Sequence, residues 1–389
     1  MQKDMLVFWV LYLLTLLIFL SKPMVVGWDP SEYLAYGKWL YSGYGFDAGY
    51  RPPVWPVILG ALWKIGLPMP LTMVTLAFLI YAAIPLFPLA VFKDSRKYIG
   101  LVIFSHPIFF NYSHLPLSHI IASLFFVMAY SAKGARAGIY AALAGLSRFT
   151  YFLSIPFLCW DDLKKWKGAV ISLVIYFSIT TFIYGNPFEQ MISASEIINY
   201  SNFISFWEKE PSFYVGLILV SPLLLLGIFS KSRFNLGFFS SLLYFTRLAH
   251  KEARFFIDQS VYLSASLVER YRHVPLLLVA MNLLFLPFSY GFSKLPVEAF
   301  EVIPDGASVA GMTPEINAYK DVYFTPVFGP PWSLDFDEEY CIYFKWSYPC
   351  YSDFCDNQTQ AFKDMCEPIY RDENLIVGKI IPHPSAEPG

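Results

Sequence analysis

The sequence predicts an all-α polytopic membrane protein with about eleven transmembrane helices and a small disulfide-bearing extracytoplasmic domain at its C-terminus. Of the 389 residues, 56% are hydrophobic and only 15% are charged, whereas an ordinary soluble domain carries roughly 25% charge. Apolar runs fill the first part of the chain, while the remainder is acidic, rich in proline and holds four of the five cysteines. We therefore divide the chain into a membrane domain, 1–290, and a C-terminal domain, 291–389.

The charge balance limits the classes of partner that the protein can have. The formal net charge is −2, and the longest basic cluster is the Lys-Lys-Trp-Lys segment 164–167. A nucleic-acid-binding domain presents a much more basic surface. We therefore exclude nucleic acid as a partner and expect membrane lipids to surround most of the chain.

Hydropathy defines the predicted spans, and the positions of Lys and Arg orient them. The first apolar run, 5–21, has no small-x-small cleavage site after it, so we interpret it as a retained anchor. The other predicted spans are approximately 70–92, 98–113, 116–132, 134–147, 149–160, 168–184, 213–229, 234–248, 255–268 and 274–290. With the N-terminus inside, every connection predicted to be cytoplasmic is basic, as the positive-inside rule requires.

Whether segment 52–67 spans the membrane determines on which side every later connection lies. It is apolar, but it starts with Pro-Pro, contains Trp55 and Trp63, and is too short to cross a bilayer. We therefore predict that 22–69 is one long extracytoplasmic loop with two interfacial helices, 31–41 and 54–65.

The cysteines also place the C-terminal domain outside the cytoplasm. Two disulfides among Cys341, Cys350, Cys355 and Cys366 suit an oxidising compartment, and the sequons at Asn111, Asn199 and Asn357 fall on the same predicted side. A zinc site is the alternative for these four cysteines, but their spacing contains no Cys-x-x-Cys pair. No metal is therefore expected, and the disulfide connectivity stays open among three possibilities.

Ionisable side chains gather on the outer side of the predicted membrane domain. Because such groups are costly in or beside a bilayer, their clustering indicates a functional site. The candidates are Asp29, Glu32, Arg51, His114, His119, Arg148, His250, Lys251, Glu252 and Arg254. Inside the predicted spans, Asp258 is the one candidate for a buried acidic relay. This distribution favours an enzyme that acts at the outer face on an anionic lipid whose tail stays in the bilayer.

Local sequence leaves the role of Asp29 open. The Asp-Pro-Ser-Glu segment 29–32 is a good helix start, with Asp29 as the N-cap and proline at the first helical position. A capping aspartate and a catalytic aspartate are equally compatible with this pattern, and one residue can serve as both.

Three segments carry a resemblance to a known family. Segment 40–45 reads Leu-Tyr-Ser-Gly-Tyr-Gly, segment 51–56 reads Arg-Pro-Pro-Val-Trp-Pro, and segment 250–255 reads His-Lys-Glu-Ala-Arg-Phe. With the acidic residue after the first span, the first two resemble the first luminal loop of GT-C glycosyltransferases. The third is similar to the His-Lys-Glu-x-Arg-Phe signature of glycosyltransferase family 22, the dolichyl-phosphate-mannose-dependent mannosyltransferases. The resemblance does not extend to the C-terminal domain, but bacterial and archaeal GT-C enzymes more often carry a soluble outer domain there, so an archaeal-type member is expected.

The resemblance implies an inverting glycosyltransferase of EC class 2.4.1, which moves a hexose, expected to be mannose, from a dolichyl or polyprenyl phosphate to an extracytoplasmic glycan or glycolipid acceptor. Asp29 is then the expected general base, with Glu32 beside it. Arg254 and Arg148, with His250 and Lys251, are expected to bind the donor phosphate. No cofactor is implied beyond the lipid-phosphate-sugar donor.

We expect four further residues to support the same site: Glu252, Arg51, His114 and His119. Each residue also has a structural alternative. Arg254 can pair with Glu252 or Asp258, and Arg148 can extend to the membrane interface as arginines commonly do. For the whole protein, two alternatives stay open: transfer of another sugar to protein or surface lipid, and non-catalytic transport of a polyprenyl-phosphate sugar.

Overall fold

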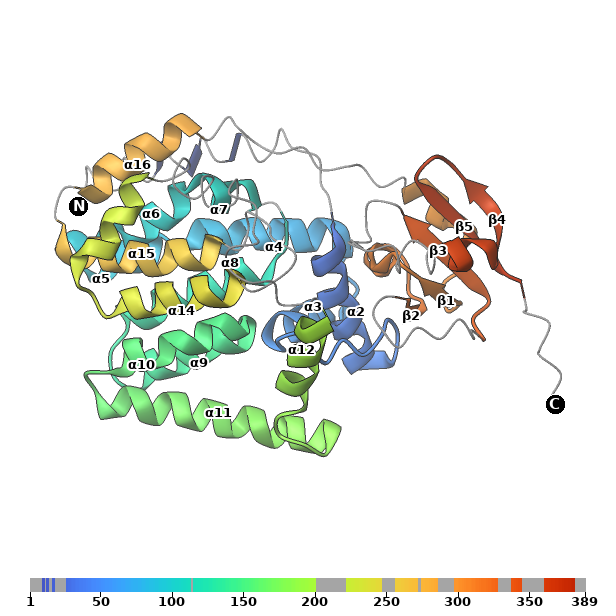
Figure 1. The fold of residues 1–389 in the computed structure, drawn as a ribbon, viewed down its shortest axis with the longest axis horizontal. Helices are drawn as coiled ribbons and strands as arrows, with labels where there is room; N and C mark the ends of the chain where they lie inside the picture. Colours follow the sequence, from blue (N-terminus) through green and yellow to red (C-terminus); the bar gives the residue numbers. More distant parts are fainter. Residues whose placement is uncertain are drawn as a thin grey trace. The chain divides into compact units, whose positions relative to one another are not determined.

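The structure is a computed structural model that describes residues 9–10, 12–13, 16–17, 26–112, 115–200, 222–246, 256–271, 274–285, 297–327, 337–344 and 360–381. The described part of the chain is mostly helical, with one small sheet near the C-terminus (Figure 1). It forms two compact units. The first comprises Met1–Met24, Pro52–Trp55 and Val74–Gly291, and the second comprises Val25–Arg51, Pro56–Met73 and Phe292–Gly389.

The first unit is a helical bundle. Its helices are α4 (Met69–Ala83, shared with the second unit), α5 (Leu86–Val91), α6 (Ile99–Ser105), α7 (Pro107–Tyr112), α8 (Ser118–Ser131), α9 (Ala135–Ser147), α10 (Ser154–Cys159), α11 (Leu163–Tyr184), α12 (Glu189–Tyr200), α14 (Phe234–Thr246), α15 (Phe256–Arg270) and α16 (Val274–Phe285), with 3-10 turns η1 (Ser95–Tyr98), η2 (Phe149–Leu153) and η4 (Pro222–Ser230). α9 packs against α8 and α11, and α15 packs against η4, α14 and α6. Aromatic side chains such as Phe126, Tyr151 and Tyr262 contact one another in its core. Cys159 is buried and forms no disulfide.

The prediction of eleven full-length spans is wrong for the part of the chain that the structure describes. Only two apolar stretches there are long enough to cross a membrane, Met69–Val91 and Leu163–Tyr184. Helices do occupy most of the other predicted segments, but they are short: α8 and α9 have 14 and 13 residues. At 1.5 Å per residue, such helices extend about 20 Å, less than the roughly 30 Å of hydrocarbon in a bilayer. Hydropathy identified the apolar segments but not the breaks within them.

The second unit joins the first loop to the C-terminal sheet. From the loop come α2 (Trp28–Ser42) and α3 (Val54–Lys64), and from the C-terminal part come η6 (Val297–Val302), β1 (Ser308–Gly311), η7 (Pro314–Ala318), β2 (Tyr323–Pro326), β3 (Tyr340–Phe344), β4 (Cys366–Arg371) and β5 (Leu375–Ile380). The strand order is β2-β1-β3-β5-β4, with β1 parallel to β2 and β3, and β5 antiparallel to β3 and β4. This sheet was not predicted from the sequence, because its strands are only four to six residues long.

The helix α2 lies inside the second unit. Residues 30–38 are all buried, so this segment packs against protein, whereas the sequence predicted an interfacial helix with one face in the membrane surface. Its Ala35 and Tyr36 share a hydrophobic core with the C-terminal residues Phe300 and Phe324. The first loop and the sheet therefore stabilise each other.

Two glycines allow α2 and α3 to cross closely. A side chain at Gly37 would meet the backbone oxygen of Pro56 at 2.4 Å, and one at Gly60 would meet the backbone oxygen of Gly37 at 2.5 Å. Any larger residue at either position would push the helices apart. This crossing fixes the segment of α2 that follows the acidic residues.

Backbone and side-chain bonds attach the loop to the sheet. The Gly45 N–H donates to the Val322 oxygen at 2.7 Å, and the Phe324 N–H donates to the Gly45 oxygen at 2.9 Å, so the loop extends the sheet beside β2. The Lys38 ammonium, which is 2% exposed, donates to the Lys320 oxygen at 2.8 Å and forms a 2.6 Å ion pair with Asp321. Burial lowers the pKa of Lys38, although Asp321 opposes that effect.

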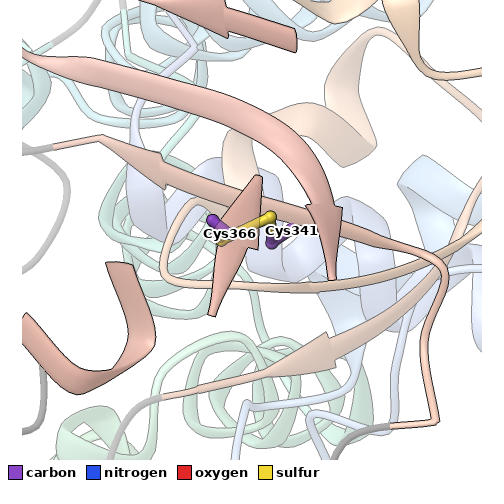
Figure 2. Close-up of a disulfide and its surroundings, with 2 residues drawn as sticks. All are labelled: Cys341 and Cys366. Atoms are coloured by element: carbon purple, nitrogen blue, oxygen red, sulfur yellow. A yellow bond between two sulfur atoms is a disulfide. The ribbon is translucent and has the colours of Figure 1, made fainter. Parts of the chain in front are cut away.

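A disulfide joins Cys341 on β3 to Cys366 at the start of β4 (Figure 2). Their Cα atoms are 5.9 Å apart, in the usual range for a disulfide. This pair confirms the predicted disulfide chemistry for two of the four cysteines, while Cys350 and Cys355 lie outside the described residues. The bond closes a loop of 25 residues, which limits the freedom of the unfolded chain and so stabilises the fold.

Candidate functional site

Most of the described candidate residues form two charged clusters, one in each compact unit. The acidic cluster consists of Asp29, Glu32, Tyr50 and Arg51 in the second unit. The arginine cluster consists of Arg148, Thr150 and Asp258 in the first unit.

The acidic cluster begins in the first turn of α2. Gly27, not Asp29, occupies the N-cap position, and no side chain caps the helix. The capping interpretation of Asp29 is therefore wrong, because the helix starts two residues earlier than the Asp-Pro-Ser-Glu pattern indicates. Asp29 and Glu32 are three residues apart on a helix, so their side chains lie on the same face.

Arg51 binds both carboxylates. Its Nη2 donates to Asp29 Oδ1 at 2.7 Å and also to Glu32 Oε2. The guanidinium carbon lies 5.3 Å from the ring centres of both Tyr33 and Tyr50, within the range of cation–π attraction. Arg51 is therefore held between two acidic side chains and two aromatic rings. From the sequence, only a supporting role was predicted for it.

Tyr50 completes the cluster. Its hydroxyl donates to Glu32 Oε1 at 2.7 Å, so the two carboxylate oxygens of Glu32 are held by different residues. Sequence reasoning missed Tyr50, although its position next to Arg51 was a usable signal. Glu32 is 1% exposed, while the side chains of Asp29 and Arg51 are 14% and 21% exposed. Asp29 is therefore the more accessible of the two acids.

Two carboxyl groups share one guanidinium in this cluster, and these neighbours shift the pKa values of Glu32 and Arg51. Burial raises the pKa of Glu32, Arg51 lowers it, and Asp29 raises it further, so that the pKa lies above its ordinary value of 4.5. Burial lowers the pKa of Arg51, but Asp29 and Glu32 outweigh it and hold that pKa well above its ordinary value. The cluster therefore holds one more carboxyl group than it has cations. An ionised carboxylate with a fixed orientation is the group that accepts a proton in general base catalysis.

The arginine cluster lies at the junction of α9 and η2. Arg148 follows α9, and its Nε donates to Asp258 Oδ2 at 2.7 Å. Thr150 donates its hydroxyl to the same oxygen at 2.8 Å. Asp258 is in the first turn of α15 and is fully buried, whereas the Arg148 side chain is 15% exposed. One acid here balances one arginine.

The remaining candidates are either buried elsewhere or undescribed. His119, in the first turn of α8, is 2% exposed and belongs to the interior of the first unit. His114, His250, Lys251, Glu252 and Arg254 lie outside the described residues, so the His-Lys-Glu-Ala-Arg-Phe segment stays a prediction. Among the described ranges, no group of three or more His, Cys, Asp or Glu side chains is arranged to hold a metal ion.

A polar cavity of about 170 Å³ lies in the C-terminal part of the second unit. Its lining includes Tyr343, Lys363, Arg371 and Glu373, and the disulfide residue Cys366 borders it. None of the candidate residues lines this cavity.

Comparison with known proteins gives no independent assignment of this arrangement. No protein-family model, no curated protein and no solved structure matches the chain. Its function therefore has to be argued from the two clusters and from the sequence segments that carry them.

Proposed function

We propose that the protein is a membrane glycosyltransferase of the GT-C type that transfers a hexose, with mannose as the first candidate, from a polyprenyl-phosphate donor to an extracytoplasmic glycan or glycolipid acceptor. The observation that carries the proposal is the acidic cluster, in which Asp29 and Glu32 share the single cation of Arg51. The resemblance of the first loop and of segment 250–255 to these enzymes supports the same assignment.

The proposed reaction is a single displacement. The acceptor hydroxyl oxygen forms a bond to the anomeric carbon while the bond from that carbon to the phosphate oxygen breaks. The hydroxyl proton goes to Asp29, and the bonding electrons leave with the polyprenyl phosphate. The anomeric configuration is inverted, and no covalent sugar–enzyme intermediate forms.

Asp29 suits the role of base better than Glu32. It is 14% exposed, so an acceptor hydroxyl can reach it, whereas Glu32 is 1% exposed and has both oxygens engaged. A base must lie within hydrogen-bonding distance of the proton that it removes. We therefore assign Asp29 to proton transfer, while Glu32 and Tyr50 hold Arg51 and the helix in place.

The leaving phosphate needs cations, because its negative charge grows as the glycosidic bond breaks. Arg148 is the described candidate, and Arg254, His250 and Lys251 are candidates from the sequence. Mutation of Arg148 tests whether it supplies one of these cations.

The experiment is transfer by the purified full-length protein in lipid nanodiscs, given labelled dolichyl-phosphate-mannose and a mixture of glycolipid acceptors. We expect Asp29→Asn to lower turnover by about 10²- to 10⁴-fold, with donor binding unchanged. Asp47→Asn is the matched control, because Asp47 is an exposed acid in the same loop, and it should keep wild-type turnover. Full turnover by Asp29→Asn would disprove the base assignment. Movement of the donor across liposomes without transfer to any acceptor would show a transporter instead.

A further inference from the structure

Asp258 is a fully buried acid whose contacts connect two segments that the sequence analysis treated separately. It lies in the first turn of α15, directly after the predicted phosphate-binding segment 250–255. Its Oδ2 accepts one bond from Arg148 and one from Thr150, at 2.7 and 2.8 Å. The start of α15 and the turn after α9 are therefore joined through a single carboxylate oxygen.

Aromatic side chains also contact Arg148 and Thr150. The guanidinium carbon of Arg148 lies 5.7 Å from the ring centre of Phe245 on α14. The Tyr262 hydroxyl, one helical turn after Asp258, donates to the Thr150 backbone oxygen at 3.3 Å. The position of Arg148 therefore depends on residues from α14, α15 and η2.

A purely structural role explains this buried ion pair poorly. Removing two charges from water is costly, and well-packed apolar residues in place of a buried pair are often as stable or more stable. Ionisable residues placed within apolar, membrane-type segments are usually functional for the same reason. Arg148 is the more exposed partner, so it is the member of the pair that a ligand can reach.

We propose that Asp258 is a positioning residue that acts through Arg148 to orient its guanidinium toward the phosphate of a polyprenyl-phosphate ligand. The bond from Asp258 is made at Nε, on the side of the guanidinium nearest the side-chain stem, and so fixes the plane of the group. The carboxylate also balances the charge of Arg148 when no phosphate is bound. This inference rests on the proposed function for the identity of the anion.

The test measures binding rather than turnover. Full-length protein in nanodiscs is titrated with a short-chain polyprenyl phosphate, for the wild type, Asp258→Asn, Arg148→Gln and the double variant. Charge-assisted hydrogen bonds are about twice as strong as neutral ones, so we expect Asp258→Asn to weaken binding about tenfold. If Asp258 acts through Arg148, the same substitution should change nothing once Arg148→Gln is present, because coupled residues are not additive.

Further variants distinguish a loss of ligand binding from a loss of folding. Asp258→Glu keeps the charge and should recover part of the lost affinity. Asp94→Asn removes the acid of an exposed pair with Arg96, also at 2.7 Å, and should leave binding unchanged. The double variant removes both buried charges together, so it should melt at a higher temperature than either single variant.

Three results would overturn the proposal. One is an equal loss of affinity on Asp258→Asn with and without Arg148, and a second is unchanged binding with only a lower melting temperature. A wild type that binds no polyprenyl phosphate would overturn it as well. A wild type that binds polyprenyl phosphate with the expected coupling but transfers no sugar would refute the proposed function and leave the positioning role of Asp258 supported.

Discussion

The acidic cluster and the arginine cluster both combine arginine with acidic side chains, but in different proportions. In the first, Arg51 pairs with two carboxylates, and in the second, Arg148 pairs with the carboxylate of Asp258. The excess acid in the first cluster gives it a group that can accept a proton. The balanced pair in the second has no such excess, and it holds a cation in a defined orientation. This difference in the ratio of acids to arginines is the reason for proposing a base in the first cluster and a binding group in the second.

The largest expected effect comes from removing the shared cation. Arg51→Met leaves two carboxylates facing each other, one of them fully buried, and breaking a buried pair in this way costs about 3–5 kcal/mol. We expect transfer to fall below detection and the melting temperature to fall with it. The comparison is Arg148→Met, which leaves one unpaired acid and should be less harmful to stability. A smaller loss for Arg51→Met than for Arg148→Met, measured by thermal unfolding in nanodiscs, would contradict this difference between the clusters.

The attachment of the first loop to the sheet should have the next largest effect. Lys38→Met removes a buried ammonium together with its bonds to Lys320 and Asp321. Hydrogen bonds to charged groups contribute about 1.5–3 kcal/mol, and we expect a loss in that range. Asp321→Asn should cost less, because the Asp321 side chain is 40% exposed. Chemical denaturation of both variants measures the difference, and equal losses would show that Lys38 is held by other contacts.

The pH dependence of activity should report the raised pKa of Glu32. Below that pKa the side chain is neutral and loses its ion pair with Arg51, so transfer should decline as the pH falls toward the ordinary value of 4.5. Glu32→Gln should remove this limb from the pH profile of kcat/KM. A profile that is identical in both proteins would show that Glu32 does not titrate in the free enzyme.

The stability of the fold has a related pH dependence, whose sign follows from proton binding. Because the pKa of Glu32 is raised in the folded state, that state binds the proton more tightly than the unfolded chain does. The stabilisation that proton binding at Glu32 gives to the fold is fully present at a pH below the unfolded-state pKa. It is lost as the pH rises through the folded-state pKa. Glu32→Gln should therefore flatten the stability curve in this window.

The smallest expected effect is that of Tyr50→Phe. The substitution removes one hydroxyl that donates to Glu32 and keeps the ring beside Arg51. A single hydrogen bond contributes about 1 kcal/mol. Since that bond lowers the pKa of Glu32, its loss should move the acid limb of the activity profile to higher pH. A shift to lower pH would show that Tyr50 stabilises the neutral form of Glu32.

Part of the candidate site was predictable from sequence. Asp29, Glu32 and Arg51 were singled out as charges in one predicted outer loop, and the helices α2 and α3 lie close to their predicted positions. Their bonding was not predictable, because a contact between residues 29 and 51 depends on how the intervening chain turns. The same reason applies to Arg148 and Asp258, which are 110 residues apart. From the sequence, Asp258 was a possible partner of Arg254. In the structure, Asp258 accepts a hydrogen bond from Arg148.

The amino-acid sequence by itself determined the apolar, helical character of the first part of the chain, its difference in composition from the acidic C-terminal part, and the disulfide chemistry seen at Cys341 and Cys366. These properties follow from composition and local pattern, which act over a few residues. Only the tertiary structure decided how long each helix is, that the C-terminal part forms a sheet, and that the first loop shares a core with it. It also decided which acid meets which arginine, because long-range packing selects among partners that are locally equivalent.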